Sequence, residues 1–191
     1  PARLRSKLWA ILSLLAALSF SLPGYTAEVC GGPVSNSLTS TCTITSGNGL
    51  TVNSSGAITV TGAPAVTSSG TGAYLNNSGT LNSANDHTVY LGTAGTSIET
   101  INNSGIISNS TGSSAINIDD NSTAHIGQIT NSGTLSGGNT GVFVGVNGTM
   151  DSITNTSSGQ ILGNLWFGIH NNNGTIGNIQ NNGTITGGSS G

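Results

Sequence analysis

The feature that most constrains this chain is an internal repeat built around the phrase Asn-Ser-Gly-Thr-Ile. Its glycines are 23, 26, 28, 26 and 24 residues apart, at Gly56, Gly79, Gly105, Gly133, Gly159 and Gly183. A branched aliphatic residue lies two positions after each glycine: Ile58, Leu81, Ile107, Leu135, Ile161 and Ile185. A unit of this length cannot bury its apolar side alone, so the repeat predicts a stack of similar coils.

Each repeat contains three short segments in which apolar and small polar residues alternate. One segment leads up to the glycine and one follows it. The third lies in the middle of the repeat, as VYL (89–91), INI (116–118), VFV (142–144) and LWFGI (165–169). The fifth repeat fits only with a two-residue shift, which places Met150 and Ile153 in the apolar positions before its glycine. Alternation of this kind predicts strands with one buried face.

We therefore predict an all-β fold, a parallel β-helix or β-solenoid of about six coils of roughly 25 residues. The aliphatic row should lie inside it. Asparagines two positions before the glycines predict a hydrogen-bonded ladder along the axis: Asn77, Asn103, Asn131 and Asn181. Glycine and asparagine suit the corners because both tolerate positive φ. Asn109 is interpreted as a turn residue that tolerates exchange for aspartate, unlike the inward Ile107.

Residues 1–27 resemble a secretory signal peptide. All three basic residues lie within the first seven positions, and an apolar run of 15 residues follows at 8–22. This run is shorter than the roughly 20 residues that cross a membrane. We expect a signal helix that is cleaved after Ala27, with cleavage after Gly24 as the alternative.

Cys30 and Cys42 are the chain's two cysteines. An isolated pair in an exported protein predicts a disulfide, here closing an N-terminal cap over residues 28–42. The repeats then occupy 43–191. The chain starts with proline rather than methionine and stops inside a repeat, so we expect it to be part of a longer polypeptide.

The charge distribution excludes several classes of partner. After the leader the chain has six acidic residues and neither lysine nor arginine, a formal charge of −6. Without cations it cannot neutralise phosphates or sulfates. Nucleic acid, heparin and anionic membrane surfaces are therefore excluded as partners.

Several phrases of the repeat resemble bacterial autotransporter passenger domains. They are INNSGIIS (101–108), ITNSGTLSG (129–137), IQNNGTITG (179–187) and, near the N-terminus, CTITSGNGLTVNSSGAITV (42–60). The resemblance covers about residues 42–191. It implies a right-handed parallel β-helix, secreted through the inner membrane and exported through an outer-membrane barrel translocator of the same polypeptide, to the cell surface or beyond.

These observations favour a structural stalk or adhesin, whose partner would be a surface protein or glycan of a host or neighbouring cell. We expect no catalytic residues, cofactor or metal. One alternative is a β-helical polysaccharide-active enzyme with its active site outside this fragment. The acidic clusters Asp86-His87 and Asp119-Asp120 are its weak support, because acids are common in turns. An ice-binding solenoid is the other alternative, but among the outward pairs after the repeat glycines only Thr184/Thr186 is Thr-x-Thr.

The adjacent aromatics Trp166 and Phe167 leave two interpretations open. If their segment is a strand, one ring faces the core and the other faces outward, where it could stack on a sugar or a protein. Otherwise a turn covers the ring.

Overall fold

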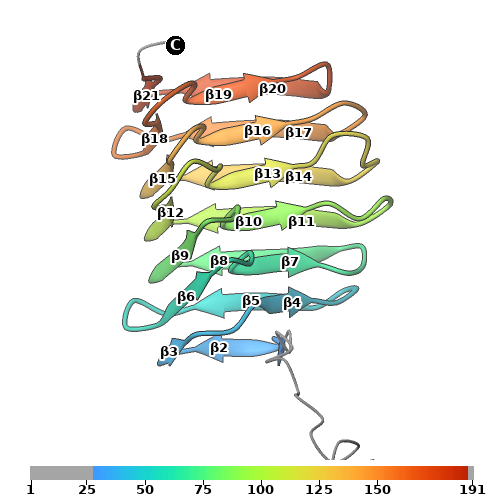
Figure 1. Ribbon diagram of the computed structural model, residues 1–191, viewed down its shortest axis with the longest axis vertical. Coiled ribbons are helices and arrows are strands. Elements are labelled where there is room, and N and C mark those ends of the chain that lie inside the picture. Colours follow the sequence, from blue (N-terminus) through green and yellow to red (C-terminus); the bar gives the residue numbers. More distant parts are fainter. Residues whose placement is uncertain (1–27, 189–191) are drawn as a thin grey trace, which may run out of the picture.

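The computed structural model describes residues 28–188, which form one stack of short parallel strands (Figure 1). The strands belong to three sheets of seven strands each. Sheet A contains β1 (Glu28–Val29), β4 (Cys42–Ile44), β7 (Val66–Ser68), β10 (Val89–Leu91), β13 (Ile116–Ile118), β16 (Val142–Val144) and β19 (Ile169–Asn171). Sheet B contains β2 (Gly32–Val34), β5 (Gly49–Val52), β8 (Ala73–Asn77), β11 (Ser97–Asn103), β14 (His125–Asn131), β17 (Thr149–Asn155) and β20 (Thr175–Asn181). Sheet C contains β3 (Ser37–Leu38), β6 (Ala57–Thr61), β9 (Thr80–Ala84), β12 (Ile106–Asn109), β15 (Thr134–Gly137), β18 (Gln160–Gly163) and β21 (Thr184–Thr186).

Each coil contributes one strand to each sheet, in the order A, B, C, and pairs in parallel with the coil before it. The chain completes about six turns between the first and the last coil. Neither a helix nor any helical segment able to span a membrane occurs within residues 28–188. The prediction of an all-β parallel solenoid is confirmed. The predicted signal peptide and its helix, residues 1–27, lie outside the described residues.

The first coil has no counterpart in the repeat pattern. Residues 28–42, expected to be a cap, contain β1, β2 and β3, and β3 pairs with β6 of the next coil. This coil lacks the glycine phrase of the later repeats. Its partly buried residues Val34 and Leu38 nevertheless pack against the core. The stack therefore starts before the repeat becomes visible in the sequence.

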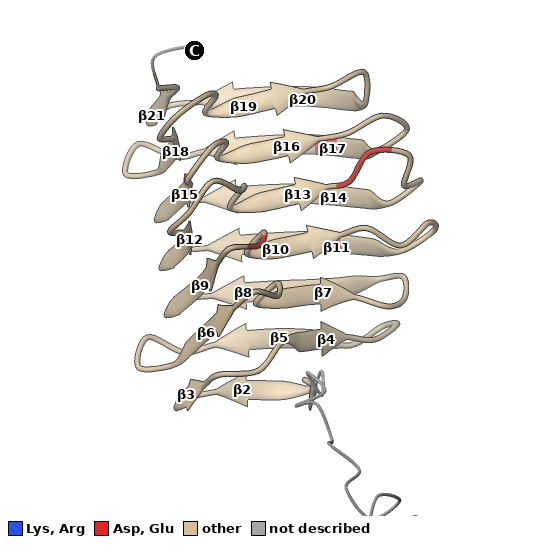
Figure 2. Cartoon of the chain, in the orientation of Figure 1, with Lys and Arg blue, Asp and Glu red and all other residues tan. Residues whose placement is uncertain are grey.

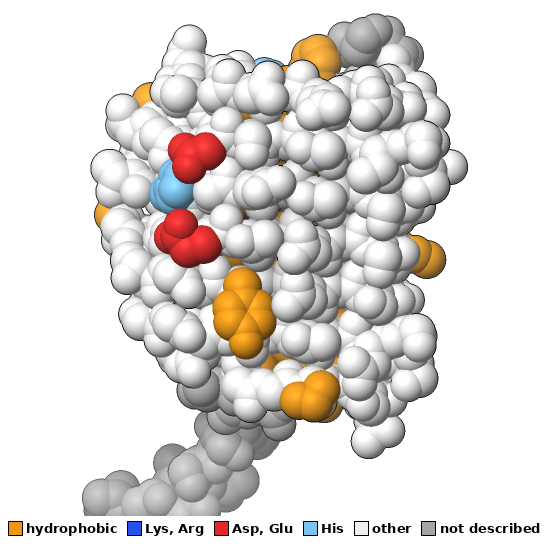
Figure 3. Space-filling view, turned by 180° about the vertical axis from the view of Figure 1, so that it is seen from behind, with side chains coloured by type: hydrophobic (Ala, Val, Ile, Leu, Met, Phe, Trp, Pro, Cys, Tyr) orange, Lys and Arg blue, Asp and Glu red, His pale blue; other side chains and the backbone are white. Residues whose placement is uncertain are grey.

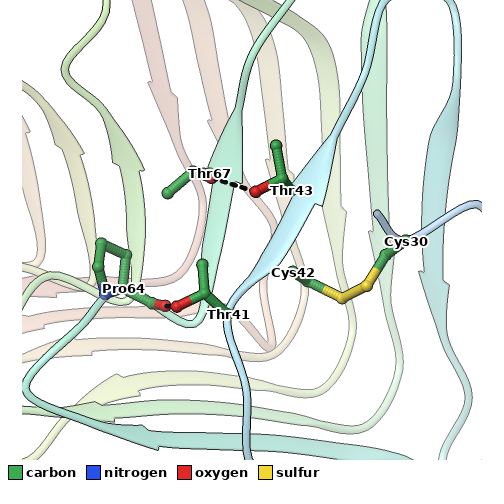
Figure 4. The surroundings of a disulfide bond; sticks show 6 residues. All are labelled: Cys30, Thr41, Cys42, Thr43, Pro64 and Thr67. Carbon is green, nitrogen blue, oxygen red and sulfur yellow. Dashed lines mark hydrogen bonds between the residues drawn. A yellow bond between two sulfur atoms is a disulfide. The ribbon is translucent and has the colours of Figure 1, made fainter. Parts of the chain in front are cut away.

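The disulfide lies where this first coil meets the second (Figure 4). Cys30 and Cys42 are bonded, with their Cα atoms 5.4 Å apart. Close by, Thr43 Oγ1 and Thr67 Oγ1 are 3.1 Å apart and share a hydrogen bond between the second and third coils. Because Cys42 is fully buried at the start of β4, the bond ties the first coil to the end of the core.

The repeat aliphatics form one continuous inward row of sheet C. Strand register places Ile58 beside Leu81, Leu81 beside Ile107, and Ile107 beside Leu135. Ile161 and Ile185 extend the row. All except Ile185, which is partly buried in the last coil, have no exposed surface. Burying one such side chain contributes about 1.5–3 kcal/mol, so the row supplies a large part of the stabilising free energy.

A second row consists of asparagine side chains at the ends of β8, β11, β14, β17 and β20, and all of them except Asn181 in the last coil are buried. Each side-chain amide donates to the next one along the axis at 2.8 Å, from Asn77 through Asn103, Asn131 and Asn155 to Asn181. Asn155 was missed by the sequence analysis because it lies four residues before its glycine. The fifth repeat has a turn two residues longer, which also explains the shifted core positions Met150 and Ile153.

The repeat glycines are required for close approach between coils. None of them has positive φ. A Cβ on Gly105 would overlap the carbonyl oxygen of Gly79, and one on Gly133 would overlap that of Gly105. The same crowding occurs at Gly183 above Gly159. Positive φ occurs instead in other corners. At the corner between sheets A and B the positive-φ residues include Gly47, Gly72, Gly95, Asn121, Asn147 and Asn173, and at the corner between sheets C and A they are Gly62 and Asn85.

The interpretation of Asn109 as a tolerant turn residue is wrong. Asn109 ends β12 and its side chain is only 2% exposed. Its Nδ2 donates to the carbonyl oxygens of Ser83 and Asp86, and its Oδ1 accepts the backbone N–H groups of Thr111 and Ser113 at 3.0 Å each. The side chain therefore organises the loop that leads from sheet C to sheet A.

The described residues include no lysine or arginine and only a few acidic residues (Figure 2). Seen from behind, the stack shows a histidine between two acidic side chains on an otherwise uncharged surface (Figure 3). Across sheet B, His125 Nε2 lies 3.1 Å from Asp151 Oδ1, and both side chains are partly exposed. The pair links β14 to β17 and contributes little to stability at this exposure.

Candidate functional site

The outward row of sheet A changes character along the stack. Register aligns Thr67, Tyr90, Asn117, Phe143 and His170 in consecutive coils. These side chains alternate with fully buried aliphatics, as in the strand VYL of β10. The row therefore begins with small hydroxyl side chains and continues with an aromatic and amide surface. Sequence analysis singled out the segments of this row, but not its outward members.

Three side chains near the start of this surface, those of His87, Tyr90 and Asp119, form a connected cluster. The rings of His87 and Tyr90 stack in near-parallel planes, with centroids 5.5 Å apart. Tyr90 donates its hydroxyl hydrogen to Asp119 Oδ2 at 2.8 Å. Burial is the main cause that raises the pKa of Tyr90 to about 12, and the hydrogen bond to Asp119 adds to it. The hydroxyl thus stays protonated as a donor.

Burial also lowers the pKa of the His87 imidazole, although Asp86 and Asp119 oppose this effect. His87 is therefore neutral at pH 7, and its Nδ1 accepts the backbone N–H of Ser114 at 3.2 Å. Asp86 Oδ1 accepts the backbone N–H of His87 at 2.7 Å. The Asp86-His87 pair is held by the loop around it and offers no free base on Nδ1.

The carboxylates of Asp119 and Asp120 accept hydrogen bonds from different coils. Asp119 accepts from Tyr90 of the preceding coil. Asp120 Oδ1 accepts the backbone N–H of Val146 at 2.9 Å and Nδ2 of Asn172 at 3.0 Å, both from later coils. Each carboxylate therefore joins neighbouring coils, and both remain on the outer surface. Paired acids working as general acid and base need a substrate between them, whereas one oxygen of each of these carboxylates already accepts hydrogen bonds within the protein.

The expectation of a strand over LWFGI is wrong for most of that segment. The strand is β19 (Ile169–Asn171), and Trp166 and Phe167 lie in the corner loop before it. The loop is fixed by the Trp166 N–H, which donates to the carbonyl of Asn139 at 2.9 Å. Phe167 packs on the ring of His170 with centroids 4.6 Å apart. Trp166 is 49% exposed, so its ring is not covered by the turn.

A cavity of about 230 Å³ lies between these groups. Its lining includes His87, Asn117, Asp119, Phe143 and Trp166. Asp120, Asn139 and the loop at 112–114 complete its wall. The structure thus brings together two acidic clusters and an aromatic residue that were considered separately in the sequence. Asn117 and Phe143 were missed, and their only sequence signal is an outward position within a β-strand.

Other predicted residues lie away from this cavity. The repeat glycines and aliphatics form the interior and the corner between sheets B and C, and the disulfide closes the first coil. Within the described part of the chain, no group of three or more His, Cys, Asp or Glu side chains is arranged to hold a metal ion. The cavity on sheet A is therefore the candidate functional site of residues 28–188.

The chain matches no protein-family profile, no curated protein and no solved structure.

Proposed function

We propose that this chain belongs to the passenger domain of a bacterial autotransporter and serves as a structural stalk or adhesin at the cell surface. The observation that carries the proposal is the uninterrupted stack of three parallel sheets of seven strands. Such a stack is a rigid rod whose corners carry the variable loops. We infer a right-handed coil, because parallel crossover connections are right-handed in nearly all proteins.

Export is part of this proposal. The signal-like segment at 1–27 supports passage through the inner membrane. The Cys30–Cys42 disulfide supports an oxidising compartment. Secretion through an outer-membrane barrel of the same polypeptide follows from the resemblance of residues 42–191 to passenger domains.

The binding partner is proposed to be a protein or glycan on a host or neighbouring cell. No lysine or arginine follows position 7, which argues against nucleic acid as the binding partner. The alternatives have weaker support. Engagement of Asp119 and Asp120 between coils argues against a polysaccharide-active centre here. Outward Thr-x-Thr pairs do not recur on sheet C, where Thr80 and Asn82, for example, lie beside Ile106 and Ser108, so a flat ice-binding face is not built.

Antibodies raised against residues 28–188 test the proposal on intact cells of the organism that encodes the chain. We expect them to label unpermeabilised cells, and we expect the purified protein to compete with cell adherence. Protease added outside should remove the label. Labelling that requires permeabilised cells would show that the protein is not displayed at the surface, and the proposal would be wrong.

A further inference from the structure

His87 joins two coils of the stack by accepting a hydrogen bond on a nitrogen that can be protonated. Its Nδ1 accepts the backbone N–H of Ser114, 27 residues later in the next coil, at 3.2 Å. In the opposite direction, the carbonyl of Ser114 accepts the N–H of Thr88 at 3.1 Å. Ser114 is only 4% exposed, so its N–H depends on an acceptor within the protein. The imidazole supplies that acceptor at the corner between sheets C and A.

The same corner of the following coils is held by groups that do not titrate. The N–H of Asn139 donates to the carbonyl of Ser113 at 3.0 Å, and the N–H of Trp166 donates to the carbonyl of Asn139 at 2.9 Å. A backbone carbonyl remains an acceptor at any pH at which the protein is folded. A histidine, in contrast, changes its charge and its hydrogen-bonding capacity between roughly pH 5 and 8. The contact between His87 and Ser114 is therefore sensitive to pH in a way that the later corner contacts are not.

Protonation reverses the role of the His87 Nδ1 atom. In the neutral imidazole that accepts from Ser114, the ring hydrogen is on Nε2 and Nδ1 has a free lone pair. The imidazolium has an N–H on both nitrogens, so its Nδ1–H and the Ser114 N–H would point at each other. The hydrogen bond is then lost and a buried donor is left without an acceptor. Because an unpaired buried donor is unfavourable, protonation favours separation of Ser114 from the ring.

The groups that face the imidazole offer the protonated ring another partner. Asp86 precedes His87 in the chain, Asp119 comes from the next coil, and both carboxylates attract a positive charge on the ring. Tyr90 stacks on the ring with centroids 5.5 Å apart and donates its own hydroxyl hydrogen to Asp119. The described residues include no lysine or arginine, so no such cation competes for the carboxylates. The environment of His87 thus contains one partner for the neutral ring and others for the charged ring.

We propose that His87 is a pH-sensitive latch: when neutral it holds the corner loop at 112–114 against the preceding coil, and when protonated it releases the loop. In the released state the imidazolium turns toward Asp86 and Asp119, and the loop moves outward. The loop lines the cavity on sheet A together with His87 and Asp120, so release opens one wall of this cavity. The latch goes beyond the proposed adhesin function and does not depend on what the protein binds.

The direction of the pH effect follows from burial of the ring. Burial is the largest cause that lowers the pKa of His87 below its ordinary value of 6.5, against the attraction of Asp86 and Asp119. The latched corner therefore binds the proton more weakly than the released corner, in which the ring is exposed. The latch is fully effective above pH 6.5 and weakens as the pH falls from 6.5 through the lowered pKa. Since one proton is involved, the ratio of released to latched corner rises by up to about tenfold per pH unit over that interval.

The test measures amide hydrogen exchange by NMR on the purified secreted protein between about pH 7.5 and about pH 5. The protection factor of the Ser114 amide, corrected for the intrinsic exchange rate, should fall by up to about tenfold per pH unit below pH 6.5. The amides of Asn139 and Trp166 are internal controls, because their acceptors are backbone carbonyls, and their protection should stay constant. The ring protons of His87 should titrate with a midpoint below pH 6.5.

The substitution His87→Asn separates titration from loss of the contact. The asparagine Oδ1 replaces Nδ1 as an acceptor and does not titrate, so the protection of Ser114 should be the same at both ends of the pH range. The matched control is His125→Asn, because His125 is on sheet B beside Asp151 and outside the cavity. This control should keep the full pH dependence of Ser114.

Three results would overturn the inference. They are protection of Ser114 that does not change with pH, an equal fall of protection at Asn139 and Trp166, and a pH dependence of Ser114 that persists in His87→Asn. The second result would mean that acid loosens the whole stack, and the third that another group titrates. The first two are measured on the unmodified protein, so they decide the question even if His87→Asn does not fold.

Discussion

The asparagine ladder makes a specific prediction about where along the stack a substitution is costly. We compare Asn103→Val with Asn77→Val. The two side chains are 2% and 1% exposed and occupy equivalent positions in adjacent coils. They differ in their place in the ladder, because Asn103 is inside it and Asn77 is its first member. Valine already occupies the same row in the preceding coil, at Val52.

The difference in cost follows from counting unpaired oxygens. The native ladder leaves one, Asn77 Oδ1. In Asn77→Val that oxygen is removed while Asn103 Oδ1 loses its donor, so the number stays at one. In Asn103→Val the oxygen of Asn77 remains unpaired and Asn131 Oδ1 also loses its donor, which gives two. One additional unpaired buried acceptor costs about 1–3 kcal/mol.

Asn103→Val should therefore lower the free energy of unfolding by about 1–3 kcal/mol more than Asn77→Val. For a chain of this size that corresponds to a further decrease in melting temperature of about 2–12 °C. Urea titration followed by circular dichroism measures the difference. Hydrogen exchange of the 101–107 amides locates it, which matters because solenoids can unfold in parts. Equal destabilisation by both substitutions would refute the ladder as a continuous hydrogen-bonded element.

Three further predictions concern single sites. Asn109→Asp should lower the free energy of unfolding by about 2–4 kcal/mol, because it replaces two donated hydrogen bonds by repulsion between a carboxylate and carbonyl oxygens; a melting temperature unchanged within error would show that the side chain is not buried. Secreted protein should begin near Glu28 in N-terminal sequencing and show no titratable thiol until Cys30–Cys42 is reduced, after which stability should fall by up to about 3 kcal/mol; a free thiol in the folded protein would contradict this. Tyr90 should ionise near pH 12 in an ultraviolet titration. Asp119→Asn should lower this pKa only in part, because burial, the largest cause of the shift, remains. Because the folded pKa of Tyr90 is above its unfolded value, its contribution to stability is present below pH 10 and is lost as the pH rises through about 12; an unchanged pKa in the Asp119 variant would refute the contact.

The sequence by itself determined the architecture. The spacing of the repeat glycines predicts a stack of coils, and the alternation around Ile107 and Leu135 predicts which side chains face inward. Both signals are local, since a side chain two positions along a strand returns to the same face. Because the pattern repeats, equivalent residues of successive coils align when the coils stack, as Ile107 aligns with Leu135.

Tertiary structure alone decided how residues meet where the repeat is irregular. Loop lengths differ from coil to coil, so the position of Asn155 in the ladder and the burial of Asn109 do not follow from counting residues. The candidate site depends on the same irregularity. Tyr90 meets Asp119 across 29 residues, and the loop of Trp166 extends over the same face of sheet A. These contacts are set by the stacking of coils and by the paths of their corners, whereas the one-dimensional pattern specifies only which residues face inward.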